Sequence, residues 1–322
     1  MGMHNSEIDM NFTLDDVMAL EALDKKLRAI LPEQYQYSYD DVLPVSMGSA
    51  GLKFDDDGRV AWNKIWATFC DLAMAGGPPH RGTLLEPTSE EAVSAAPENY
   101  RRVADEIRRG VSLVTGLAVL EDSTDIPGWI GIQCRGVGMS GWLVRAIVME
   151  NVLARHIAEI LYLPAGPEFR LGREIKNVIT TVAKACHYWN EHMPADQQEA
   201  IQRMFENASI DMELLEPASF PEVQNDPDSY RQAVGTLSRE ITERTGKACF
   251  PNRYVGWIGV ECPDVRFAIG LMRAMVVENV LARREETVLF LPVSARFVQG
   301  GRAERLLRTF EQMNRLQGLR KS

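Results

Sequence analysis

Two stretches of this chain occur twice, each time at the same separation. The stretch Gly128–Cys134 (GWIGIQC) returns as Gly256–Cys262 (GWIGVEC), and Arg145–Arg155 (RAIVMENVLAR) returns as Arg273–Arg283 (RAMVVENVLAR). The offset is 128 residues in both cases (256 − 128 and 273 − 145). A period of this length indicates that a whole folding unit is present twice, and this restricts the fold more than any single motif does.

The repeat extends beyond these two stretches. Upstream, Leu84–Pro87 (LLEP) returns as Leu214–Pro217 at an offset of 130 (214 − 84), so the loop before the Gly-Trp stretch differs by two residues. A weaker partial copy lies near the start of the chain, where Leu43-Pro44 precedes Gly58-Arg59. The predicted organisation is an N-terminal helical region with this partial repeat (1–82), repeat 1 (83–165), linker helices (166–212), repeat 2 (213–293) and a C-terminal helix (294–322).

Each repeat has a pattern of strands and helices that points to one motif. Apolar runs predict strands at 84–87, 117–120, 129–134 and 160–163, and helical spacing predicts helices at 100–115 and 140–156. Gly116 stands where a glycine commonly ends a helix. The order βαββαβ is that of the ferredoxin-like motif. The predicted fold class is therefore α+β, with two tandem ferredoxin-like repeats and extra connecting helices.

The Gly-Trp strand predicts how the two repeats assemble. Alternation along the strand puts Ile130 and Ile132 on one face and Trp129 on the other, where Trp257 is its copy. A face that carries a large aromatic side chain has to be covered. We therefore expect the two sheets to face each other across a pseudo-two-fold axis, with a small ligand held between them and in contact with Trp129 and Trp257.

Composition excludes several classes of function. The chain has 322 residues, 45% of them hydrophobic, and a formal net charge of −10, so a nucleic-acid partner is not expected. No apolar run is long enough to span a membrane, and the acidic balance disfavours an anionic membrane surface. The five widely spaced cysteines are typical of reduced thiols, which predicts a cytoplasmic protein. The sequence leaves open whether the protein forms a homo-oligomer.

The repeated helix contains the first candidate site. Glu150 and its copy Glu278 fall in the middle of an apolar stripe if the helix continues through 156. Burial raises the pKa of a carboxyl, as in general acids and bases, so both glutamates are candidate catalytic residues. Asn151 and Asn279 beside them are candidate ligand-binding residues. The alternative for all four is a structural role, with each glutamate bonded to a tryptophan indole N–H, a backbone amide or an arginine of the other repeat.

A loop present in only one repeat is the second candidate site. Ala75–Gly82 (AGGPPHRG) presents His80 and Arg81 together, while the second repeat has no such loop. Histidine transfers protons near neutral pH, and arginine binds carboxylate or phosphate. We interpret His80 as a candidate catalytic residue and Arg81 as a candidate ligand-binding residue. The alternative is a rigid connection that needs neither side chain.

Two further residue patterns can be explained either by a structural role or by a functional one. Arg145 and Arg155 fall on the other face of the repeated helix, which is either a solvated or helix-packing face or an anion site. His187 and Glu191 have the i, i+4 spacing of metal ligands, although a polar helix end explains them as well. The sequence identifies no cofactor and no resident metal.

The sequence thus supports two hypotheses about function. The first is a cytosolic enzyme or ligand-binding protein that acts on a small polar or anionic molecule in a cleft between the repeats. The second is a non-catalytic assembly or regulatory protein that uses the duplicated fold as an interaction platform. A cavity that contains His80 and a carboxyl favours the first, and a filled interface with an exposed apolar patch favours the second.

Overall fold

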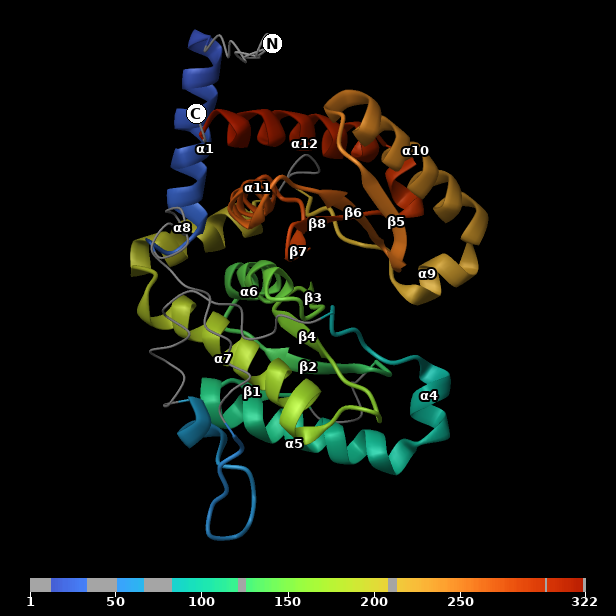
Figure 1. Ribbon diagram of the computed structural model, residues 1–322. Coiled ribbons are helices and arrows are strands. Elements are labelled where there is room, and N and C mark those ends of the chain that lie inside the picture. The colour runs from blue at the N-terminus through green and yellow to red at the C-terminus, as the bar shows by residue number, and fades with distance from the viewer. Residues whose placement is uncertain are drawn as a thin grey trace, which may run out of the picture.

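The computed structural model shows an α+β protein with two four-stranded antiparallel sheets (Figure 1). It describes residues 13–33, 51–66, 83–120, 126–207, 213–298 and 300–320. The sheets have the strand orders β1-β2-β4-β3 and β5-β6-β8-β7. The same order in both sheets means that the chain has two similar halves.

The first half occupies the lower part of Figure 1. Its helices are α4 (Glu90–Ala95), α5 (Pro97–Thr115), α6 (Val137–Met149), the π-helix η3 (Leu171–Ile175), α7 (Lys176–Glu191) and α8 (Ala195–Glu206). Its strands are β1 (Ala118–Val119), β2 (Trp129–Gln133), β3 (Arg155–Ile157) and β4 (Ile160–Pro164).

The second half repeats this order from α9 to α12. Its helices are α9 (Phe220–Asn225), α10 (Pro227–Thr245), α11 (Val265–Val277), the 3-10 helix η5 (Ala295–Val298) and α12 (Arg302–Leu319). Its strands are β5 (Cys249–Tyr254), β6 (Trp257–Glu261), β7 (Arg283–Glu285) and β8 (Val288–Pro292). Helix α1 (Leu14–Ile30) precedes both halves and packs on α8, α11 and α12.

Several sequence predictions agree with the structure. The Gly-Trp stretches form β2 and β6, with Ile130 and Ile132 fully buried. Gly116 and Gly246 end α5 and α10 in the left-handed conformation, as predicted for Gly116. The predicted helix at 140–156 is wrong at both ends, because α6 spans Val137–Met149.

The end of α6 has a clear physical cause. Asn151 has a positive φ of 61°, and its counterpart Asn279 after α11 has a φ of 59°. Asparagine tolerates this left-handed conformation better than most residues and stops a helix there. The chain then turns back, so Arg155 lies in strand β3 and not on a helix face.

The predicted ferredoxin-like strand order is not confirmed. In that order the first strand, 84–87, would lie inside the sheet between the third and fourth strands. Instead β2 pairs directly with β4, and Leu85 forms an isolated parallel bridge with Val152. Strand β3 occupies the fourth position in the sheet and forms a hairpin with β4. The predicted helix at 140–156 overlaps the start of this strand.

The predicted face-to-face packing of the two sheets is also not confirmed. Helix α6 of the first half contacts strand β7 of the second sheet. Figure 1 shows α6 and α11 beside the boundary between the halves, with the edge strands β3 and β7 nearest to it.

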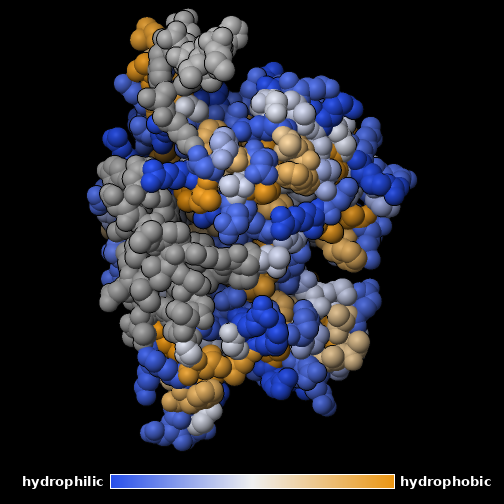
Figure 2. All heavy atoms as spheres, in the orientation of Figure 1, coloured by the Kyte–Doolittle hydropathy of each residue, from blue (hydrophilic) through white to orange (hydrophobic). Residues whose placement is uncertain are grey.

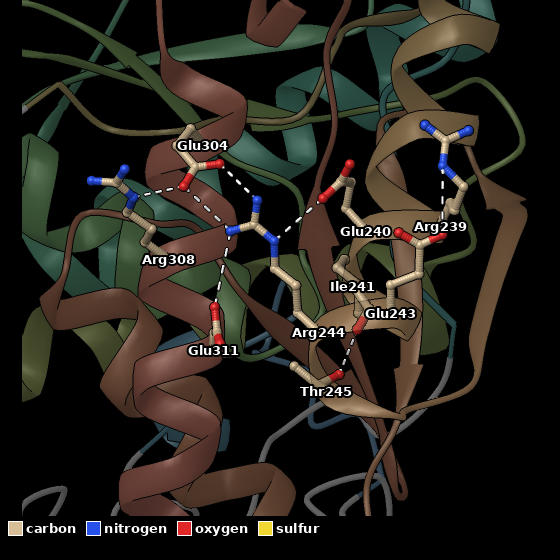
Figure 3. Close-up of polar contacts among 9 residues, drawn as sticks. All are labelled: Arg239, Glu240, Ile241, Glu243, Arg244, Thr245, Glu304, Arg308 and Glu311. Atoms are coloured by element: carbon tan, nitrogen blue, oxygen red, sulfur yellow. Dashed lines mark hydrogen bonds and ion pairs between the residues drawn. The ribbon is translucent and has the colours of Figure 1, made fainter.

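The helix after each sheet completes its half. Helix α7 packs on α5 and α6, and α12 packs on α10 and α11. Arg244 of α10 anchors α12 through Glu304, at 2.8 Å, and Glu311, while Arg308 holds Glu304 from the other side (Figure 3). Hydrogen bonds from Arg244 and Arg308 lower the pKa of Glu304 to about 2. Helix α7, which we assigned to a linker, therefore packs within the first half as α12 does within the second.

A glycine before each Gly-Trp strand is required by its backbone. Gly128 has a φ of +81°, and a Cβ atom there would lie 2.4 Å from the carbonyl oxygen of Thr88. We expect Gly128→Ala to lower the free energy of unfolding by about 2–4 kcal/mol, because strain and the backbone clash add together. Gly235→Ala, inside α10 with open space around the new methyl group, is the control and should raise it by about 0.5–1 kcal/mol. Urea unfolding of the three proteins measures both effects, and equal stability of parent and Gly128→Ala would contradict the prediction.

Candidate functional site

The candidate site is a cleft of about 460 Å³ between the two halves. Figure 2 shows the surface hollowed there, between the upper and lower parts of the molecule. Equivalent stretches of both halves line it, residues 86–91 with Trp129 and residues 217–221 with Trp257. The predicted contact of Trp129 and Trp257 with such a cleft agrees with the structure, although no ligand tests their binding role.

The LLEP motif holds each side of the cleft in place. Leu85 N–H donates to Asn151 O at 2.9 Å, and Leu153 N–H donates to Leu85 O at 2.8 Å. Leu215 makes the same bonds with Asn279 and Leu281. The glutamate that follows each leucine, Glu86 or Glu216, is thereby fixed beside the end of the repeated helix.

Asn151 and Asn279 connect the halves. Arg145 Nη2 of the first half donates to Asn279 Oδ1 of the second at 2.7 Å. In the other direction, Arg283 Nη1 donates to Asn151 Oδ1 at 3.1 Å, and Asn151 Nδ2 donates to Arg284 O at 2.8 Å. Both asparagines thus make hydrogen bonds across the boundary between the halves, and neither lines the cleft.

Arg145 is buried, so the solvated-face alternative is wrong. Its guanidinium lies 4.5 Å from the ring centre of Phe205 in α8, which matches the helix-packing alternative. Burial lowers the pKa of Arg145 to about 10. This arginine is part of the boundary between the halves.

Arg155 and Arg283 occupy equivalent places in β3 and β7 but have different surroundings. Arg283 is fully buried, and its Nη1 also donates to Glu285 Oε1 at 2.8 Å. The residue equivalent to Glu285 is Ile157, so Arg155 has no carboxylate on its own strand. Arg155 lies 4.4 Å from the ring centre of Trp129 and borders the cleft.

Several buried N–H groups at the cleft have no hydrogen-bond partner among the described residues. They are Nε and Nη2 of Arg155 and Nε1 of Trp257. Nearly all buried polar groups in proteins are hydrogen-bonded, and leaving a charged group unpaired is costly. A ligand or water in the cleft would supply the missing acceptors.

Burial affects both glutamates of the LLEP motif. Burial raises the pKa of Glu86, and the charge of Arg283 opposes the shift. Burial likewise raises the pKa of Glu216 against the charges of Arg145, Arg296 and Arg155. The carboxyls of the motif thus face arginines of the opposite half, and ionising them costs free energy.

The free-energy cost of ionising a buried glutamate predicts how the stability of the fold depends on pH. The pKa of Glu216 is raised above its ordinary value of 4.5, so its ionised form destabilises the fold. The penalty is absent below the unfolded pKa and grows as the pH rises through the folded pKa. We expect Glu216→Gln to melt at a higher temperature than the parent at neutral pH. The difference in melting temperature should vanish as the pH falls to the ordinary pKa of a glutamate. Melting curves across this range measure it, and a variant less stable than the parent at pH 7 would contradict it.

The structure places the predicted catalytic glutamates outside the cleft. Glu150 is buried and binds Lys184 of α7 at 2.7 Å, while Glu278 is half-buried and binds Lys26 of α1 at 2.7 Å. Neither lines the cleft, because α6 and α11 end just before them. The helical stripe used in the prediction therefore does not continue past the glutamate. His80 and Arg81 lie outside the described residues.

Sequence reasoning missed two residues that line the cleft and a third whose charge interacts with one of them. Glu86 and Glu216 stand in a repeated motif that was interpreted only as a strand end. Arg155 was placed on the far face of a helix that ends earlier. The available signal was the repetition of a glutamate between an apolar pair and a proline, since a carboxyl has no packing reason to recur there.

The buried cysteines have an ordinary structural explanation. Cys134, Cys186 and Cys262 are buried thiols, and burial raises the pKa of Cys134 to about 12, which agrees with core cysteines. In the part of the chain that the structure describes, no three His, Cys, Asp or Glu side chains form a metal-binding group. None of the described helices is long and apolar enough to cross a membrane.

Comparison with known proteins gives no family for this chain: no family model matches it, and no curated protein is similar to it.

Proposed function

We propose that this protein binds a small polar molecule that carries an acid group in the cleft between its two halves. The observation that carries the proposal is Arg155, a cleft-lining guanidinium with two buried N–H groups that no described residue accepts. Arginine presents its donors in a planar fork that matches carboxylate and phosphate oxygens. The acid group of the ligand would lie against Arg155.

The acidic groups of the cleft support a polar rather than a purely anionic ligand. Glu86, Glu90 and Glu91 line the cleft together with Arg155. A ligand with hydrogen-bond donors or an amino group beside its acid group meets both kinds of partner. Glu86, whose pKa is raised by burial, is also placed to exchange a proton with such a ligand if the protein is an enzyme.

The matching halves are part of this proposal. We propose that they derive from one duplicated unit and are related by a pseudo-two-fold axis, which would account for equivalent groups on both sides of the cleft. The unit differs from a ferredoxin-like unit in strand order. Divergence of the two copies at Ile157 and Glu285 then leaves a single arginine available to a ligand.

A second candidate function rests on a separate observation. Leu14, Val17 and Met18 are exposed on α1 at helical spacing, with Leu14 76% exposed. An exposed apolar stripe favours the hypothesis of an assembly or regulatory protein. The cleft favours the first hypothesis because it contains unpaired polar groups, which an interaction platform does not need.

Native mass spectrometry of the purified protein, followed by a thermal-shift screen, tests the proposal. The screen compares amino acids, simple carboxylates and phosphate esters on the parent and on Arg155→Gln. We expect at least one acid to raise the melting temperature of the parent and to have little effect on Arg155→Gln. The proposal fails if no acid shifts the parent, or if the shift is the same in both proteins.

A further inference from the structure

The end of helix α7 brings two histidines together, outside the cleft. The Nε2 atoms of His187 and His192 lie 3.2 Å apart. Residues five apart on a continuous helix point about 140° away from each other, so their side chains do not normally meet. They meet here because α7 ends at Glu191 and His192 is its C-cap.

The turn that carries His192 is held from several sides. Pro194 follows it and begins α8. The side-chain amide of Gln198 donates to Trp189 O at 2.8 Å and to Met193 O at 2.9 Å. Because both carbonyls are fixed, the position of His192 relative to His187 is set by the backbone and not by the histidines alone.

Aromatic neighbours orient both rings. The Trp66 ring lies edge-on to His187 with 5.8 Å between centroids, and the Tyr188 ring lies 5.6 Å from His192. The two imidazole planes are inclined at 68°. The rings are thus held with their Nε2 atoms close together.

This spacing matches a shared ion. Two imidazole nitrogens bound to one tetrahedral zinc ion at about 2.0–2.1 Å lie about 3.3–3.4 Å apart. Without an ion, the same separation allows one ring to donate a hydrogen bond to the other, so the pair is held together in either state. Imidazole is also a preferred ligand of zinc and of the neighbouring divalent ions.

We propose that His187 and His192 form a binding site for a tetrahedral divalent metal ion, Zn²⁺ or Co²⁺. Glu191, the metal partner suggested by sequence spacing, is exposed, and His192 replaces it. Since no third ligand of the usual kinds joins the pair within the described ranges, water completes the coordination. Such a site exchanges its ion, with a Kd on the order of 10 µM.

Metal titration of the untagged, full-length protein tests this site. After treatment with a chelator, the protein is titrated with Zn²⁺ by calorimetry and with Co²⁺ by visible absorption, where tetrahedral coordination gives intense bands. We expect one ion per chain and tetrahedral Co²⁺ bands. His187→Ala should weaken Zn²⁺ binding by at least about tenfold, because loss of even an outer-shell partner has that effect.

Three further variants keep the result interpretable. Glu191→Gln should bind Zn²⁺ like the parent, because that side chain is not a ligand. His192→Asn retains a residue suited to a helix end, so weaker binding with an unchanged melting temperature supports the site. The double variant His187→Ala/His192→Asn should lose the Co²⁺ bands. Unchanged Zn²⁺ binding in the double variant, or no binding to the parent at about 1 mM Zn²⁺, overturns the proposal.

Discussion

Ile157→Glu should strongly weaken ligand binding in the cleft while leaving the fold intact. Ile157 occupies the register position of Glu285, since Ile157 pairs with Ile160 as Glu285 pairs with Val288. A glutamate there would place a carboxylate beside Arg155, as Glu285 lies 2.8 Å from Arg283. The internal carboxylate is always present and competes with the acid group of any ligand. We expect affinity to fall about a hundredfold, or about 2.7 kcal/mol.

The measurement is a calorimetric titration with the acid that gives the largest thermal shift on the parent. Ile157→Gln is the control, because it has the size and polarity of the glutamate variant without its charge. Ile157 is exposed, so both variants should unfold within about 0.5 kcal/mol of the parent. Equal affinity of the Glu and Gln variants would mean that Arg155 does not bind the acid group.

The parts of the fold that could be predicted from the sequence are those fixed by local chemistry. The alternation of Trp129 to Gln133 predicts strand β2, and Gly116 marks the end of α5. The β3–β4 hairpin could not be predicted in the same way. Its turn has Ala158 with a φ of 50°, where a typical two-residue turn has asparagine or glycine. The repeat of Arg145 to Arg155 also concealed the end of α6, because one copied stretch contains both a helix and a strand.

The candidate site was predictable only where the position of a residue follows from the alternation along its own strand. Trp129 and Trp257 were placed on the open faces of their strands, and both line the cleft. The role of Arg155 depends on Ile157 two residues away and on Glu216 in the other half. Spacing along the sequence does not give such contacts between the halves. The pairing of Glu150 with Lys184 of α7 lies within the first half, but it too joins residues that are distant in the sequence, so spacing does not reveal it.

Breaking the Glu150–Lys184 pair should lower the free energy of unfolding more than any other substitution proposed here. Lys184 and Glu150 are both buried, and their side chains meet at 2.7 Å. We expect Lys184→Met to lower the free energy of unfolding by about 3–5 kcal/mol, because it leaves a buried carboxylate without this cation. Adding Glu150→Met should restore most of the loss, since an apolar pair of similar volume needs no counterion.

The second half supplies the matched control, because Glu278 is the counterpart of Glu150. Its partner Lys26 has a side chain that is 51% exposed, so water can replace the ion pair when the lysine is removed. Lys26→Met should therefore cost no more than about 1 kcal/mol. Denaturant unfolding of the parent and the three variants decides the matter. If Lys184→Met and Lys26→Met cost the same, burial does not distinguish the two pairs, and the repeated glutamate has one and the same role in both halves.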